Sequence, residues 1–65
     1  MGFPENLARL QEERGISSYR LAKDLGCSPK SVTNWKRGLK PQLWHLSALA
    51  DYFGVSVDEL EADDG

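Results

Sequence analysis

Residues 17–38, which read SSYRLAKDLGCSPKSVTNWKRG, predict two short helices joined by a tight turn. Ser17 is a favoured N-cap residue for the first helix, which we expect over residues 18–25. Gly26 ends that helix because glycine readily adopts a positive φ. Ser28 is placed to cap the second helix in the same way. The rest of the chain is expected to pack around this pair.

The second helix, expected over residues 29–37, has one apolar and one polar face. Pro29 fits its first helical position. Val32 and Trp35 are three positions apart, so they predict a buried side. The other side carries polar residues at i, i+3, i+4 and i+7, namely Lys30, Thr33, Asn34 and Arg37. A short helix held by its apolar side, with amides and cations outward, fits the major groove of DNA.

The charges are separated along the sequence. The net charge of −2 is unusual for a nucleic-acid binder. Residues 16–40, however, carry six Lys or Arg against one Asp, a net +5, whereas residues 41–65 carry six acids and no Lys or Arg, a net −6. Positive charge is therefore concentrated on the helix pair, where a phosphate backbone requires it. A solvated charged surface is the alternative interpretation.

The remaining sequence predicts three further helices and no strand. We expect helices over residues 5–14 and 42–53, and a short one that begins with a capping box of Ser56 and Glu59. Residues 61–65 are expected to fray. At 65 residues the chain predicts one compact all-α domain of four to five short helices. The expected core is Leu7, Leu10, Ile16, Leu21, Ala22, Leu25, Val32, Trp35, Leu43, Leu46, Leu49, Ala50, Phe53, Val57 and Leu60.

A longer pattern of apolar residues and glycines runs through nearly the whole chain. It consists of Asn6-Leu7-x2-Leu10-x4-Gly15-Ile16-Ser17, Leu21-Ala22-x3-Gly26, Ser28-x3-Val32-x2-Trp35-x2-Gly38 and Pro41-x-Leu43-x2-Leu46-x2-Leu49-Ala50-x3-Gly54-Val55-Ser56-Val57-x2-Leu60. In this order and spacing it resembles the Cro/C1-type helix-turn-helix (XRE-like) family of phage repressors and bacterial regulators. The resemblance implies a single lambda-repressor-like DNA-binding domain over residues 1–65. It also implies a transcription regulator that binds operator DNA as a symmetric homodimer.

The resemblance indicates which side chains meet double-stranded DNA. The base-reading positions are Pro29, Lys30, Thr33 and Asn34, and the phosphate-anchoring positions fall near Ser18, Arg37 and Lys40. Beyond the resemblance, Tyr19 and Ser28 are also expected to contact phosphate. Two positions depart from the family pattern. Family members commonly carry Gln where this chain has Ser18, which is too short to span both phosphate and recognition helix. Many members have a long polar side chain where this chain has Pro29, which offers only apolar contact.

Several of these side chains fit two roles. Lys30 suits guanine O6 and N7, and it equally suits a phosphate or solvent. Asn34 suits adenine N6 and N7, or a phosphate or water. Thr33 can touch a thymine methyl or face solvent. Arg37 can grip phosphate or favour the negative end of its own helix. Tyr19 can donate to phosphate or pack on the helix surface.

The resemblance implies a dimer surface toward the start of the helix at 42–53 and the C-terminal part of the chain, where this sequence has Leu43, Trp44, Val55 and Val57. Trp44 flanks the apolar face of its helix, and tryptophan is enriched among interface hot spots. The alternative for Trp44 is a half-buried aromatic in a small core. We expect pairing on a palindromic operator, while the free chain can be monomeric.

The sequence indicates no catalytic, metal or cofactor site. Cys27 and His45 each occur once, and neither has a second ligand at metal spacing. A single Cys suits a reducing compartment and no apolar run is long enough for a membrane span, so we expect a cytoplasmic protein. A catalytic pair of Cys27 and His45 is formally possible, but nothing indicates a cleft and so small a chain seldom builds one, so we do not expect an enzyme. A protein–protein adaptor, or an antitoxin-like component that retains the fold with weak or no DNA reading, is the alternative function.

Overall fold

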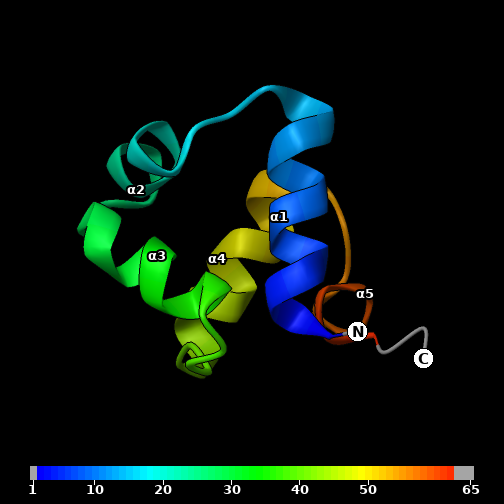
Figure 1. Cartoon of the computed structure of the whole chain (residues 1–65). Coiled ribbons are helices and arrows are strands. Elements are labelled where there is room, and N and C mark those ends of the chain that lie inside the picture. Colours follow the sequence, from blue (N-terminus) through cyan, green and yellow to red (C-terminus); the bar gives the residue numbers. More distant parts are fainter. Residues whose placement is uncertain (1, 63–65) are drawn as a thin grey trace.

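The computed structural model describes residues 2–62, which form five helices (Figure 1). They are α1 (Phe3–Arg14), α2 (Ser18–Leu25), α3 (Pro29–Lys36), α4 (Leu43–Phe53) and α5 (Val57–Glu61). Within residues 2–62 there is no strand. The all-α fold with a helix-turn-helix, predicted from the sequence, is confirmed.

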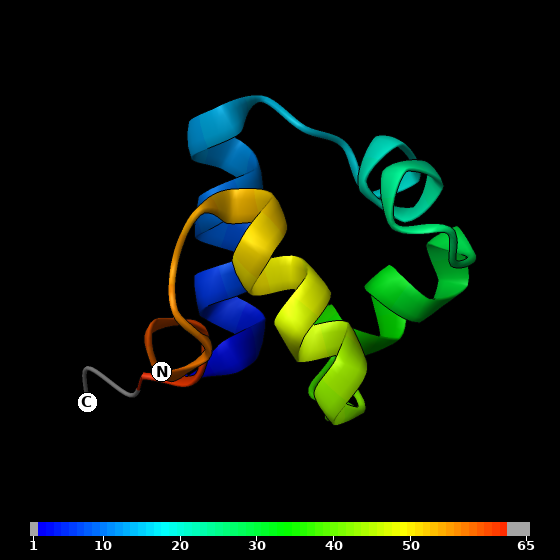
Figure 2. The same ribbon diagram turned by 180° about the vertical axis from the view of Figure 1, so that it is seen from behind.

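The helices pack on both sides of α1. α3 contacts α2 and α1, and α5 contacts α1 and α4. Both views show α2 and α3 on one side of α1, with α5 near the start of α1 on the other side (Figures 1 and 2). The helix pair is thus held at one edge of the domain.

One apolar core joins these helices. It contains Leu7, Leu10, Leu21, Ala22, Val32, Trp35, Leu49, Ala50, Phe53 and Leu60, and all of them were expected from the sequence. Leu46 is buried as well. Ile16, Leu25 and Val57 pack against the core but remain half-buried. Leu43 is 74% exposed, so its predicted place in the core is wrong. It is the first residue of α4, before the buried part of that helix begins at Leu46.

The turn between α2 and α3 forms as its residue types predict. The Ser17 hydroxyl accepts from the Arg20 amide at 3.1 Å and caps α2. Gly26 follows α2 with a φ of 76°, a conformation that residues with a Cβ rarely adopt. The Cys27 amide then donates to the Ala22 carbonyl at 2.9 Å, which satisfies one of the last carbonyls of the helix.

Several helix ends differ from the sequence prediction. α1 begins at Phe3 instead of residue 5, because the Gly2 amide donates to the Glu5 carboxylate at 2.9 Å and so extends the first turn. α3 ends at Lys36 with Arg37 as its C-cap residue, and α4 begins one residue after 42. Ser28 occupies the N-cap position of α3, but its side chain makes no capping bond and lies 3.4 Å from the Ser31 hydroxyl.

The start of the tail is hydrogen-bonded to α1. Glu61 belongs to α5, and the Ala62 carbonyl accepts from the Asn6 side chain at 2.8 Å. Asn6 Nδ2 also donates to the Leu60 carbonyl at 2.9 Å. Fraying of the tail remains a prediction, and residues 63–65 lie outside the described part. The capping box of Ser56 and Glu59 is confirmed, with the Glu59 amide 3.0 Å from the Ser56 hydroxyl.

Candidate nucleic-acid interface

α3 is fixed on one side and free on the other. Val32 and Trp35 are buried in the core, as predicted. The outward side chains are Lys30, Thr33 and Arg37, which are exposed, and Asn34, which is half-buried. The structure thus brings the predicted polar stripe together on one face of a rigidly held helix.

Hydrogen bonding within the domain determines what two side chains of this stripe, Thr33 and Asn34, can offer to a partner. The Thr33 hydroxyl donates to the Pro29 carbonyl at 3.2 Å, so its hydrogen is used within the helix and its methyl remains for outside contact. Among the described residues, none bonds to the Asn34 side-chain amide. Its donor and acceptor are therefore both available to an outside partner. Pro29 is exposed at the start of the helix and offers only apolar contact.

The candidate phosphate contacts surround α3. Tyr19, Ser28, Arg37 and Lys40 are exposed, and Ser18 is half-buried. Lys40 is not a free cation, because its ammonium lies 3.8 Å from Glu61 Oε2. This solvent-exposed ion pair is weak. It nevertheless makes Lys40 a poorer candidate anchor than Arg37.

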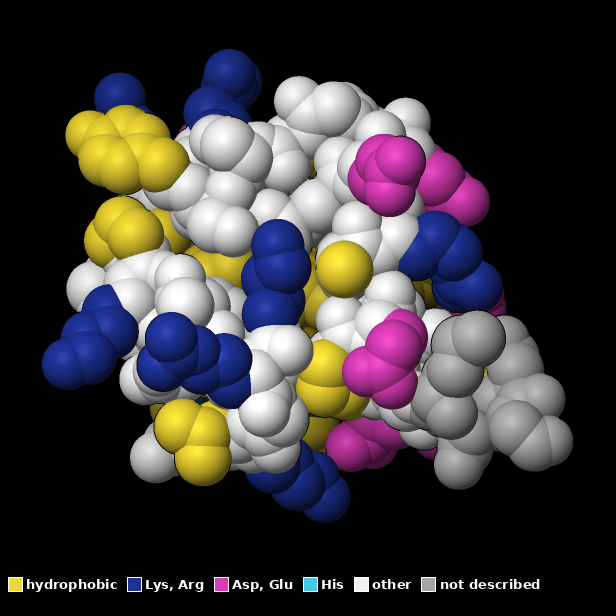
Figure 3. All heavy atoms as spheres, in the orientation of Figure 1, with side chains coloured by type: hydrophobic (Ala, Val, Ile, Leu, Met, Phe, Trp, Pro, Cys, Tyr) yellow, Lys and Arg dark blue, Asp and Glu magenta, His cyan; other side chains and the backbone are white. Residues whose placement is uncertain are grey.

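Positive charge gathers over the helix pair. Figure 3 shows most Lys and Arg side chains of this face over α2 and α3, whereas the acidic ones lie on the other side, over α1 and toward α5. The acid of the basic segment, Asp24, is exposed but is hydrogen-bonded to two neighbouring side chains. Its Oδ2 accepts from the Tyr52 hydroxyl at 2.6 Å and from Arg20 Nε at 3.4 Å. The Tyr52 hydrogen bond is the main reason why the pKa of Asp24 is lowered.

Tyr52, which connects α4 to α2 through Asp24, was not predicted from the sequence. The same hydrogen bond raises the pKa of the Tyr52 phenol. A tyrosine next to Phe53 at the end of an apolar helix offers no pattern that identifies its partner 28 positions away.

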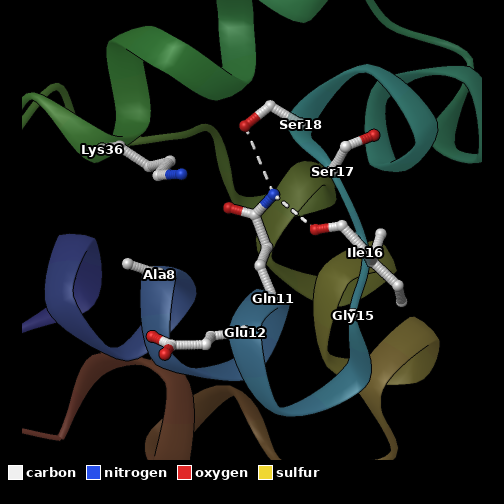
Figure 4. A pocket seen from close by; sticks show the side chains of 8 residues that line it. All are labelled: Ala8, Gln11, Glu12, Gly15, Ile16, Ser17, Ser18 and Lys36. Atoms are coloured by element: carbon white, nitrogen blue, oxygen red, sulfur yellow. Dashed lines mark hydrogen bonds between the residues drawn. The ribbon is translucent and has the colours of Figure 1, made fainter.

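A pocket of about 550 Å³ lies between the end of α1, the start of α2 and the end of α3 (Figure 4). Gln11 lies in it, only 5% exposed. Its Nε2 donates to the Ile16 carbonyl at 3.2 Å and to Ser18 Oγ at 3.3 Å. Its Oε1 is buried without a partner among the described residues. Gln11 was not predicted from the sequence either, although its spacing of four from Leu7 marks it as an inward residue of α1.

The residues expected at a dimer surface fall into two groups. Leu43 and Trp44 are 74% and 60% exposed at the start of α4. Leu39, in the preceding loop, is exposed as well. Val55 and Val57 are half-buried beyond the other end of α4, a helix of 11 residues and thus about 16 Å. The dimer surface remains a prediction, and its exposed apolar part consists of Leu43 and Trp44.

Trp44 is held in place despite its exposure. Its ring stacks on His45 with centroids 3.6 Å apart, and its Nε1 donates to Gln42 Oε1 at 2.8 Å. The His45 ring also lies 4.9 Å from that of Trp35. His45 therefore packs between two indoles.

No metal-binding cluster of His, Cys, Asp and Glu occurs within residues 2–62. Cys27 is half-buried against the core, and burial raises the pKa of its thiol. No helix in the described part of the chain has the length and apolar character needed to cross a membrane.

Comparisons with known proteins agree with this geometry. A family model for the Cro/C1-type helix-turn-helix DNA-binding domain matches residues 6–64. The chain is 32% identical to the SOS-response transcriptional repressor LexA from Eubacterium rectale, with a TM-score of 0.89 over 95% of this chain and 67% of that one. It is 36% identical to a transcriptional regulator from Listeria innocua, with a TM-score of 0.86 over 97% of this chain and 60% of that one.

The same fold recurs in a crystal structure of Fe(II)-HppE with an alternative substrate. The identity is 30% and the TM-score 0.86, over 98% of this chain but only 34% of that one. No curated protein matches the chain. The family match covers most of the chain and agrees with the geometry of α2 and α3, so the chain belongs to the family of Cro/C1-type helix-turn-helix DNA-binding domains.

Proposed function

We propose that this chain is the sequence-reading part of a transcription regulator of repressor type, with α3 placed in the DNA major groove. The observation that carries the proposal is the outer stripe of α3, Lys30, Thr33, Asn34 and Arg37, on a helix whose inner side is buried. A major groove about 12 Å wide admits one such helix. The likeness to LexA, which is described as a repressor, supports the repressor type.

Base reading is divided among the α3 side chains by their chemistry. Asn34 presents an amide that pairs with the N6 and N7 of adenine, and Lys30 donates to guanine O6 and N7. Thr33 offers its methyl to a thymine methyl, because its hydroxyl hydrogen is used by the Pro29 carbonyl. Pro29 itself provides apolar contact at the start of the helix.

Phosphate contacts provide affinity without sequence preference. Arg37 lies just after α3 and Tyr19 lies at the start of α2, both exposed. The free backbone amides at the starts of α2 and α3 add an anion-binding field. Ser18, Ser28 and Lys40 complete the set. The protein then acts without catalysis, in the compartment that holds its DNA, the cytoplasm of a bacterium.

Titration of a fluorescent random duplex with the protein over a salt series tests the proposal. About four to six neutralised phosphates predict a slope of log K against log salt near −0.9 per contact. Arg9→Ala on α1, outside the basic segment, is the matched control for Arg37→Ala and should leave the slope unchanged. If micromolar protein does not bind the duplex at low salt, the DNA proposal fails.

An adaptor function is the second candidate, and the exposed pair of Leu43 and Trp44 favours it. Exposed apolar residues that are held in place, as Trp44 is by Gln42 and His45, suit a protein partner. The salt titration separates the two functions, because an adaptor that does not bind DNA shows no salt-dependent shift of the duplex.

A further inference from the structure

Gln11 connects the helix that precedes the DNA-binding pair to the pair itself. Figure 4 shows its amide between Ser18 at the start of α2 and Lys36 at the end of α3. Both Nε2 hydrogens are used, one by the Ile16 carbonyl at 3.2 Å and one by Ser18 Oγ at 3.3 Å. None of the DNA contacts proposed above involves this buried side chain.

The surroundings of Gln11 determine which way its amide faces. The Ile16 carbonyl can only accept, so it selects the NH₂ group. Oε1 faces the side of the pocket that Lys36 and Glu12 also line (Figure 4), and it has no hydrogen-bond partner among the described residues. The Ile16 carbonyl therefore sets the amide orientation, with Nε2 toward Ser18.

This orientation decides what Ser18 can offer to a ligand. A hydroxyl has one hydrogen and two lone pairs. Because Gln11 Nε2 can only donate, Ser18 Oγ must accept from it, and the hydroxyl hydrogen is kept for another partner. Ser18 is the first residue of α2, where unpaired backbone amides already favour an anion. An approaching phosphate oxygen supplies the acceptor that this hydrogen needs.

We propose that Gln11 is a positioning residue that makes Ser18 a hydrogen-bond donor to a DNA phosphate. The inference rests on the proposed function and concerns the phosphate contact at the start of α2. In the resembling family a glutamine is common at the position of Ser18, and its one side chain spans both the phosphate and the recognition helix. In this chain the Gln11 amide of α1 orients the short Ser18 hydroxyl of α2, which makes the phosphate contact.

The test is the effect of Ser18→Ala on affinity for a fluorescent duplex, measured in three backgrounds. In the wild-type background we expect a loss of roughly tenfold, the size of a hydrogen bond to a charged group. In Gln11→Met the hydroxyl is no longer oriented, and Ser18→Ala should cost about twofold or less. In Gln11→Glu the carboxylate accepts the hydroxyl hydrogen, so Ser18→Ala should cost nothing further.

Comparison within each background cancels the charge that Gln11→Glu adds and any general loss of stability. Ser18→Thr keeps the hydroxyl and should keep the affinity. If Ser18→Ala costs the same in all three backgrounds, the inference is wrong while the proposed function stands. If the wild-type chain does not bind the duplex, the proposed function itself has failed.

A second measurement needs no change at Gln11. Its side-chain amide resonances should shift when the duplex binds, because polarising the Ser18 hydroxyl strengthens the bond that Gln11 donates to it. In Ser18→Ala that shift should disappear. An equal shift in both proteins would overturn the inference.

Discussion

Truncation to Ala should lower the thermal stability of the protein at Asn6 and its preference for a DNA site at Asn34. The reason is that Asn6 holds the fold together, whereas Asn34 faces outward. Asn6 is 4% exposed, and its Nδ2 donates to the carbonyls of Leu60 at 2.9 Å and Ala62 at 2.8 Å. These carbonyls belong to the end of α5, where a helix has no internal donors left. Asn34 lies on the outer side of α3, and α3 and α5 are on opposite sides of α1.

The size of the Asn6→Ala effect follows from these contacts. The Leu60 bond is buried, and a buried carbonyl without a donor costs about 1–3 kcal/mol. The Ala62 carbonyl is only partly buried and can turn to water, so it adds little. A total of about 2 kcal/mol is a large share of the roughly 3–10 kcal/mol expected for 65 residues. At about 4–8 °C per kcal/mol, Tm should fall by about 8–16 °C.

Thermal unfolding followed by circular dichroism measures this change, and duplex titration in the cold measures binding while Asn6→Ala is still folded. Asn34→Ala is the matched control. Its Tm should move by less than about 3 °C, while its preference for the selected site falls by roughly tenfold. The reasoning is refuted if Asn6→Ala lowers Tm no more than Asn34→Ala. It is also refuted if Asn34→Ala leaves the selected-site profile unchanged.

Three further predictions concern other parts of the molecule. Arg37→Ala should weaken selected and random duplexes alike and reduce the salt slope by about one, whereas Lys40→Ala, whose ammonium is already paired, should change the slope less; salt titrations compare the two. Tyr52→Phe removes the hydrogen bond that holds the pKa of Asp24 below 3.8. At neutral pH its free energy of unfolding, measured with denaturant, should therefore be lower than that of the wild-type chain, and this difference should vanish as the pH falls through the lowered pKa of Asp24. The contribution of the Tyr52 hydroxyl to the free energy of unfolding is fully present below pH 10.0 and should be lost as the pH rises through the raised pKa of Tyr52. Trp44→Ala should reduce cooperative binding to a duplex with two half-sites about 10 base pairs apart while single-site binding persists; undiminished cooperativity would exclude Trp44 from the dimer surface.

The helix-turn-helix could be predicted because local rules decide it. Ser17 and Gly26 act within one turn of their own positions, and the spacing of Val32 and Trp35 requires only that the helix has one buried side. The starts of α1 and α4 and the end of α3 differ from the prediction by one or two residues. Such ends depend on which backbone amides find a partner, as the Gly2 amide does in Glu5.

Other features could not be predicted because they depend on which elements meet in space. Leu43 continues the apolar spacing of α4, yet it is exposed at the first position of the helix. Gln11 has the spacing of a core residue and the polarity of a surface residue, and the positions of the Ile16 carbonyl and the Ser18 hydroxyl explain its burial. The two halves of the expected dimer surface are close in neither sequence nor space, because α4 separates them.

The separation of charge explains how an acidic chain carries a DNA-binding domain. The domain extends 30 Å along its longest axis, more than three Debye lengths of about 8 Å at physiological salt. A phosphate backbone at α2 and α3 therefore interacts mainly with the net +5 of residues 16–40, while the acids toward α5 are screened. At longer range the net charge of −2 provides no attraction. Contact, rather than attraction from a distance, must then supply the affinity, which makes the placement of each donor around α3 decisive.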